Sequence, residues 1–176
     1  QDIDLRVFPT FRPDKVVAID DPLKYPDYLS QLGSAADVNI DSLDSLLDAL
    51  QARVEFFPEM GARIADFGLS TLQSVNLQAQ WLDISFKSVL NGEPLSAHET
   101  EDLQAHILTE LSKMYHQKGW TQQFHLGALR DINTRALREI GPDTGYDSIG
   151  DFNHAARLSK FFNNLDNSDQ LAKTII

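Results

Sequence analysis

The sequence predicts an α/β fold made of alternating βα units that share a parallel sheet. Short apolar runs bounded by turn-forming residues alternate along the 176-residue chain with longer segments whose apolar residues recur at helical spacing. The alternation occurs at least three times, which is typical of parallel strands joined by helices. Because the sequence contains no repeat, low-complexity tract or obvious linker, we expect residues 1–176 to form a single domain.

The predicted strands are short and apolar. They cover Leu5–Pro9, Ala62–Phe67, Trp120–Leu126 and Leu171–Ile176. The loop Thr10–Asp14 follows the first strand, and Pro13 keeps the residue before it, Arg12, out of helical geometry.

The predicted helices are amphipathic. Between Asp41 and Glu59, leucines recur every three or four residues and form one apolar stripe. Asp41 or Ser42 can cap the start of this helix, and Gly61 can end it. A later helix opens with Ser96-Ala-His-Glu99, which has the spacing of a capping box. The full set is a short helix within Pro22–Gly33, then Asp41–Glu59, Ala79–Leu90, Ala97–Lys118, Thr134–Ile140 and Phe152–Leu165, with a glycine-rich loop at Gly141–Asp151.

The length of the chain limits the architecture. A closed barrel of eight βα units typically needs about 250 residues, and this chain has room for about half of one. The sequence begins just before a predicted strand and ends on one, as a part of a larger barrel would. We therefore expect part of a (β/α)8 TIM-type barrel with an additional helical segment. The alternative is a complete small α/β domain whose last strand lies in the middle of the sheet.

Composition excludes several classes of partner. Acidic residues outnumber basic ones 26 to 15, giving a formal net charge of −11, which disfavours both nucleic acid and an anionic membrane surface. No apolar stretch is long enough to span a membrane, and no signal peptide is evident. The sequence has no cysteine, which removes disulfides and thiolate zinc sites and fits a cytoplasmic protein.

Candidate functional residues follow three of the predicted strands, because parallel α/β folds gather functional groups at the carboxyl ends of their strands. Arg12 follows the first strand. Asp66 and Phe67 end the second. His125 ends the third, with Arg130 close behind. These positions have the same phase within their βα units, so we expect them to share one mouth.

Each of these residues has an alternative role. The guanidinium of Arg12 can bind a carboxylate through two nitrogens, or it can form a salt bridge to Asp14 or another surface acid. His125 can be a metal ligand, an acid–base group or a hydrogen-bond donor to a hydroxyl, or it can be a histidine with a structural role in the barrel wall.

The remaining histidines and the motif search yield no further site. We expect His98, His106, His116 and His154 to be structural, with His154 exposed near the start of a helix, since none makes the i,i+4 pair of a helical zinc site. The sequence has no H-x-H, HExxH, GxGxxG, P-loop or GxSxG motif. The residues alone therefore predict a parallel α/β unit with an anion site and no metal site within this chain.

Three segments resemble the uronate isomerase family, of the amidohydrolase superfamily. They are Val7–Lys15 (VFPTFRPDK), Gly119-Trp120, and Phe124–Arg135 (FHLGALRDINTR) continued by Leu137–Asp151. The resemblance covers nearly the whole chain. It implies a metal-dependent (β/α)8 barrel that interconverts D-glucuronate with D-fructuronate and D-galacturonate with D-tagaturonate. It also implies a divalent metal, usually zinc, held by an H-x-H pair and an Asp that this chain lacks.

The resemblance also assigns residues. Arg12 matches the arginine of the family T-F-R-P-D loop, which contacts substrate, and His125 matches the histidine of the Q-L-H-I-G strand. One departure stands out: the family has S-D-H-G where this chain has Ala65-Asp66-Phe67-Gly68. Phe67 cannot coordinate metal or transfer protons, so the protein is impaired or specialised if the family histidine is catalytic. If that histidine is replaceable, we expect Phe67 to fill volume at the barrel mouth.

The resulting hypothesis is a hexuronate aldose–ketose isomerase of hexuronate catabolism. His125 is the candidate catalytic residue, Arg12 and Arg130 are the candidate substrate-binding residues, and a sugar acid is the small-molecule partner. The 176 residues alone are expected to bind no metal and to be inactive. The alternatives are a divergent hydrolase of the same superfamily, acting on a lactone or amide, and a non-catalytic assembly module. A partial barrel exposes apolar strand edges, so we also expect a homo-oligomer.

Overall fold

The fold is built on a three-stranded parallel sheet. The computed structural model describes residues 5–72 and 81–176. The strands are β1 (Ile64–Leu69), β2 (Thr121–Leu126) and β5 (Lys173–Ile175), in the order β1-β2-β5. Ile64 pairs with Thr121, and Thr121 pairs with Lys173. The three predicted strands after the first are therefore confirmed, each with its start shifted by one or two residues.

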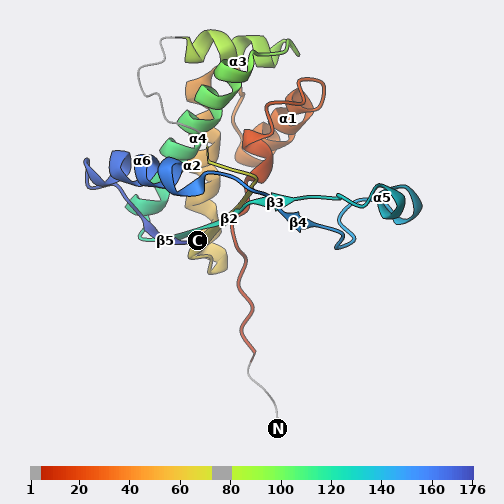
Figure 1. Ribbon diagram of the computed structural model, residues 1–176. Coiled ribbons are helices and arrows are strands. Elements are labelled where there is room, and N and C mark those ends of the chain that lie inside the picture. Colours follow the sequence, from red (N-terminus) through yellow and green to blue (C-terminus); the bar gives the residue numbers. More distant parts are fainter. Residues whose placement is uncertain (1–4, 73–80) are drawn as a thin grey trace.

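The predicted helices are all present, and the first two residues of Ala79–Leu90 lie outside the described residues. Their bounds are α1 Tyr25–Ala36, α2 Leu43–Phe56, α3 Leu82–Leu90, α4 Ala97–Gln117, α5 Thr134–Ile140 and α6 His154–Asp166, with 3-10 helices η1 Asp14–Val17 and η2 Phe57–Met60. Helices α1 to α4 lie together on one side of the sheet, whereas α5 lies apart from it (Figure 1). α1 packs on α2 and α3, and both of those pack on α4, which contacts β2 and α6.

Local sequence signals set the helix ends. Ser42 caps α2 by accepting a hydrogen bond from the backbone N–H of Ser45. Ser96 and Glu99 form the predicted capping box at the start of α4. Gly61, with φ +89°, ends η2 directly after α2, in the left-handed conformation that favours glycine.

One continuous hydrophobic core lies between the sheet and the helices. Phe67 of β1 stacks on Phe124 of β2 at 6.4 Å between ring centroids, and Phe124 meets Phe161 of α6 edge-on at 5.9 Å. Side chains alternate along a strand, so the residues next to Phe67 and Phe124 point to the opposite, open face. This alternation decides which residues are available for chemistry.

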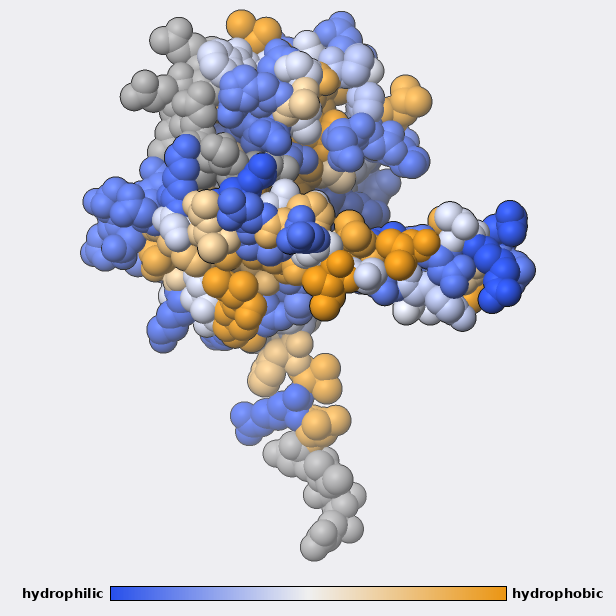
Figure 2. Space-filling model, viewed as in Figure 1, coloured by the Kyte–Doolittle hydropathy of each residue, from blue (hydrophilic) through white to orange (hydrophobic). Residues whose placement is uncertain are grey.

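A small arm projects from the body (Figure 1). β3 (Ala128–Leu129) pairs antiparallel with β4 (Ser148–Ile149), and α5 lies between them in the chain. The predicted glycine-rich loop thus contributes a short strand to the arm. Apolar side chains are exposed along it, among them Ile132, Ile140 and Ile149, and Figure 2 shows hydrophobic surface at its root.

The predicted strand Leu5–Pro9 is wrong. Residues 5–10 run away from the sheet as an irregular, exposed segment, and only Phe11 makes a bridge, to Ala65 of β1. The apolar composition predicted a strand, but a strand also requires a partner along its length, and β1 meets this segment at one residue.

Candidate functional site

Arg12, Asp66 and His125 form one charged cluster on the open face of the sheet. The Nε atom of Arg12 lies 2.9 Å from Oδ2 of Asp66. Nδ1 of His125 lies 2.7 Å from Oδ1 of the same carboxylate. The three candidate residues therefore lie together, joined by a single buried acid, although Arg12 follows the isolated bridge at Phe11 and not the strand that was predicted before it.

Backbone pairing places these side chains. Phe11 donates its N–H to the carbonyl of Ile64 and accepts from the N–H of Asp66, so the next residue, Arg12, lies beside Asp66. In the β1–β2 register, Asp66 is opposite Gln123 and Gly68 is opposite His125. Asp66 is therefore two positions before the residue opposite His125, toward the start of the strands.

The exposure of the cluster is graded. The side chain of Asp66 is 8% exposed, whereas those of Arg12 and His125 are 53% and 55% exposed. A buried carboxylate without partners is costly, and two groups that can carry positive charge offset that cost. The carboxylate of Asp66 is therefore buried beneath the other two groups, and a ligand can reach only Arg12 and His125 within this cluster.

Arg12 also contacts Asp14, as the alternative role predicted. Its Nη2 lies 3.3 Å from Oδ1 of Asp14, an atom that also accepts the backbone N–H of Gly68 at 2.8 Å. The contacts to Asp66 and Asp14 use two of the five N–H groups of a guanidinium, and the others can bind a ligand. A Cβ on Gly68 would lie 3.3 Å from Asp14 Oδ1 and 3.5 Å from Arg12 Nη2, so a side chain here would crowd this loop.

The cluster opens into a hollow of about 550 Å³. Arg12, His125 and Arg130, the three site residues predicted from the sequence, all line it. Its other lining residues are Phe124, Leu126, Ala128, His154 and Ile176. The volume suits a small ligand.

Arg130 is held by the arm. Its Nη1 lies 2.5 Å from Oδ2 of Asp147, whose Oδ1 accepts the backbone N–H of Asp131. The Asp131 N–H and then the Arg130 guanidinium lower the pKa of Asp147, so this carboxylate stays charged. Arg130 is thus a paired cation at the rim of the hollow.

His154 differs from its predicted exposed position. It is half-buried at the start of α6, lines the hollow, and its Nδ1 is buried with no hydrogen-bond partner among the described residues. A Cβ built on Gly127, where φ is +85°, would lie 2.9 Å from His154 Nε2. Close approach to the β2–β3 connection therefore holds this ring in place.

The other three histidines do not line this hollow. His116 Nδ1 lies 3.1 Å from the carbonyl of Leu171 and connects α4 to the segment before β5. Burial lowers the pKa of His106. His98 lies 3.7 Å from Asp102 on the same helix.

Phe67 does not lie at the mouth of the site, contrary to the expectation from its place in the motif. It is 1% exposed and packs among the aromatic side chains between sheet and helices. Asp66, its neighbour, takes the open face. The side chain at position 67 therefore packs in the hydrophobic core. Phe in place of the family histidine leaves the contacts of Arg12, Asp66 and His125 unchanged.

The residues of the cluster do not fit a metal site. Among residues 5–72 and 81–176, no three His, Asp or Glu side chains are close enough to share a metal ion. The Asp66 carboxylate is also already in contact with a guanidinium, which would repel a divalent cation.

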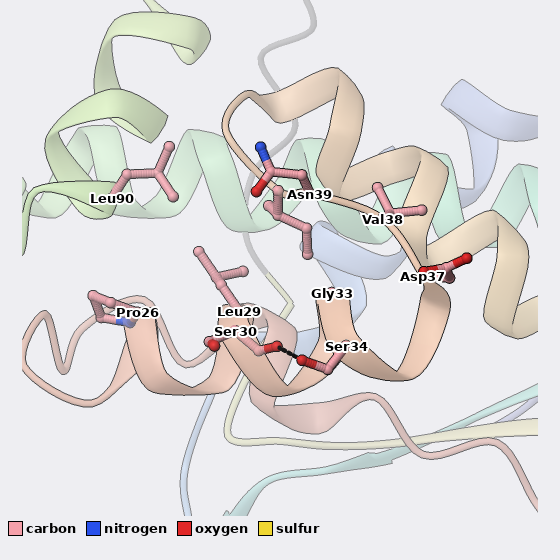
Figure 3. A pocket seen from close by; sticks show the side chains of 10 residues that line it. Pro26, Leu29, Ser30, Gly33, Ser34, Asp37, Val38, Asn39 and Leu90 are labelled. Atoms are coloured by element: carbon pink, nitrogen blue, oxygen red, sulfur yellow. Dashed lines mark hydrogen bonds between the residues drawn. The ribbon is translucent and has the colours of Figure 1, made fainter.

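A second hollow, of about 480 Å³, lies between α1, the α1–α2 connection and Leu90 of α3 (Figure 3). Ser34 donates to the carbonyl of Ser30 within α1, and Asp37 is the one ionisable residue of the lining. The hollow therefore lacks the cations and imidazoles of the cluster.

Parallel strands joined by helices, with the helices on one face of the sheet and a charged cluster on the other, are the arrangement found in βα-barrel proteins. The chain belongs to the glucuronate isomerase family, whose model matches residues 1–176.

Individual relatives agree. The chain is 44% identical over 170 residues to a uronate isomerase of Shouchella clausii and 42% identical over 170 residues to one of Cellvibrio japonicus, covering 97% of this chain and 36% of each relative. The crystal structure of uronate isomerase from Thermotoga maritima matches with a TM-score of 0.84 at 28% identity, over 95% of this chain and 36% of that one. That of glucuronate isomerase from Caulobacter crescentus matches with a TM-score of 0.78 at 26% identity, over 91% and 33%.

The chain thus spans about a third of the length of its relatives. The predicted fold class, α/β units forming part of a TIM-type barrel, is confirmed, as is the resemblance to the uronate isomerases. No helix in the described part of the chain is both long and apolar enough to cross a membrane.

Proposed function

We propose that the protein to which this chain contributes interconverts the aldose and ketose forms of hexuronates, D-glucuronate with D-fructuronate and D-galacturonate with D-tagaturonate. One observation carries the proposal: a chain matched throughout by the glucuronate isomerase family holds Arg12 and His125 side by side over a buried carboxylate. Both groups line a hollow suited to a sugar acid.

The reaction moves a carbonyl between C1 and C2 without net oxidation. From the aldose, the C2 proton is removed and a proton is delivered to C1, while the O2 hydroxyl proton is lost and O1 gains one. Negative charge develops on the enediolate oxygens between these steps.

Each exposed group of the site has a role in this proposal. Arg12 binds negative oxygen of the substrate, either its carboxylate or the developing enediolate. His125 exchanges a proton with a substrate hydroxyl, because a neutral imidazole has both a donor and an acceptor. Arg130 adds positive charge at the rim, where Asp147 holds it.

We place the divalent metal, zinc in this proposal, in parts of the protein outside this chain, because the residues described here do not fit it. When bound, such a metal supplies a Lewis acid for the carbonyl oxygen. The chain by itself is then expected to be inactive. We further propose that residues 1–176 form a single partial-barrel domain, that the protein is a cytoplasmic homo-oligomer, and that it binds neither nucleic acid nor membrane.

A substrate panel tests the function. The whole protein should convert D-glucuronate and D-galacturonate to their ketoses, observed by the anomeric-carbon signals in NMR, and should leave sugar lactones and amides intact. Hydrolysis of a lactone without isomerisation of either uronate would replace the proposal with the hydrolase alternative.

A further inference from the structure

Asp66 is the one member of the charged cluster that a ligand cannot reach. Its side chain is 8% exposed, and its two oxygens face different partners: Oδ2 faces Arg12 and Oδ1 faces His125. It therefore lies beneath the two exposed groups and touches both.

The position of His125 beside Asp66 favours hydrogen on one of the two ring nitrogens. An ionised carboxylate only accepts hydrogen bonds, so the nitrogen at 2.7 Å from it, Nδ1, is the one that bears hydrogen in the neutral ring. The other side of the ring agrees, since Nε2 of Gln123 lies 2.8 Å from Nε2 of His125 and an amide NH₂ is a donor. Both neighbours favour the same tautomer, with the Nε2 lone pair as the acceptor.

Asp66 Oδ1 needs this partner. It is buried and has no aligned hydrogen bond to any described residue, although His125 Nδ1 is within ion-pair distance. An unsatisfied buried acceptor costs about 1–3 kcal/mol. The soft Cβ–Cγ torsion of histidine allows the ring to turn until Nδ1–H points at this oxygen.

The same carboxylate also constrains Arg12. Its Nε–H side faces Asp66 and its Nη2 faces Asp14, which also accepts the N–H of Gly68. Two acids thus fix the orientation of a guanidinium that is otherwise half-exposed. Without Asp66, Arg12 would keep the weaker of these contacts, at 3.3 Å.

We infer that Asp66 is the positioning residue of this site: it holds Arg12 beside His125 and keeps the His125 proton on Nδ1, so that Nε2 is presented to the substrate. This inference rests on the proposed function for the identity of the substrate. The side-chain amide of Gln123 occupies the place at Nε2 that a sugar hydroxyl takes when substrate binds.

The first test observes the His125 ring directly in the unaltered site. In the whole protein labelled with ¹⁵N-histidine, the neutral His125 ring should show hydrogen on Nδ1, and a His125→Asn protein serves only to assign its signals. A His125 ring that carries its hydrogen on Nε2 would overturn the inference. This readout does not depend on turnover, so it separates failure of the inference from failure of the proposed function.

The second test compares two isosteric changes. Asp66→Asn should shift His125 toward the Nε2–H tautomer, lower kcat by about tenfold to a hundredfold and also raise KM, because one amide oxygen cannot accept from both partners. Asp102→Asn is the matched control, since Asp102 is 2% exposed, lies on α4 and does not line the hollow. It should leave the tautomer unchanged and kcat within about threefold. An Asp66→Asn protein with wild-type tautomer and kcat would also overturn the inference.

Discussion

Restoring the family histidine at position 67 tests whether strand alternation or motif position determines the role of this residue. Phe67 is 1% exposed and stacks on Phe124 on the helix side of the sheet. A histidine there would lie opposite the charged cluster. It would bury a polar ring beside the aromatic side chains of Phe124 and Phe161.

The expected cost of Phe67→His combines two effects. Complete truncation of a buried Phe costs about 3–5 kcal/mol, of which an imidazole recovers part through its volume. An unsatisfied buried nitrogen adds about 1–3 kcal/mol. We expect a net loss of about 2–4 kcal/mol in the free energy of unfolding, or a fall in Tm on the order of 10 °C for a chain of this size.

Thermal unfolding then measures the effect of Phe67→His on stability, and enzyme kinetics measures its effect on turnover. Phe8→His is the matched control, because Phe8 is 59% exposed, and its stability should change by less than about 0.5 kcal/mol. In the whole protein, Phe67→His should change kcat/KM by less than about tenfold, or 1.4 kcal/mol. A gain of about a hundredfold, or unchanged stability, would refute the placement of this side chain in the core.

Three further outcomes follow from the structure. Arg12→Ala in the whole protein should raise KM, lower kcat or both. Arg53→Ala, a change outside the hollow, is the control and should do neither. If the activity of Arg12→Ala stayed within about twofold of wild type, Arg12 would not belong to the site. Hydrogen bonds from Ser96 lower the pKa of Glu99, so the capping box stabilises α4 at neutral pH and this contribution is lost as the pH falls through the lowered pKa. The helicity of each protein is then measured as the pH is lowered and is expressed relative to its value at neutral pH. The wild type should lose helicity at a higher pH than Glu99→Gln, and identical curves for the two proteins would contradict this reasoning. Light scattering at high micromolar concentration should show self-association of the chain, because apolar residues of the arm such as Ile149 are exposed, and a monomer there would count against the proposed oligomer.

The helical part of the fold was predictable because its signals are local. The apolar stripe of α2, the capping box of α4 and the seven residues of α5 all lie within a few turns of sequence. The segment Leu5–Pro9 has equally strand-like composition, but its state depends on a partner elsewhere, and sequence pattern alone does not supply one.

The sequence predicted which candidate residues lie together, but it did not predict the contacts that join them. Arg12, His125 and Arg130 line one hollow, and the carboxyl-end rule accounts for His125, whereas Arg12 follows a single bridge at Phe11. The bridging role of Asp66 was missed, because it depends on the register that sets Asp66 opposite Gln123. One signal was available: an acid in the buried run Ala62–Phe67, next to Phe67, has to face away from the core or find a cation.

The β3–β4 pairing of the arm could not be predicted from the sequence, for a different reason. Its two strands are two residues each, too short for composition to reveal, and they pair across the α5 segment. The sequence indicated the helix and the glycine-rich loop, but a pairing this short depends on where the ends of the loop are held.

The parallel pairing of β1 with β2 also determines when the site appears as the chain folds. The first pair joins Ile64 to Thr121, so the whole crossover that contains α3 and α4 has to return before any β1–β2 hydrogen bond forms. Isolated helices form within microseconds, whereas pairing of residues so distant in sequence is slow. Asp66 and His125 meet only through this pairing, and the site is therefore among the last features to mature. A substitution in the crossover can delay the meeting of Asp66 and His125 in newly made protein while leaving the finished molecule unaltered.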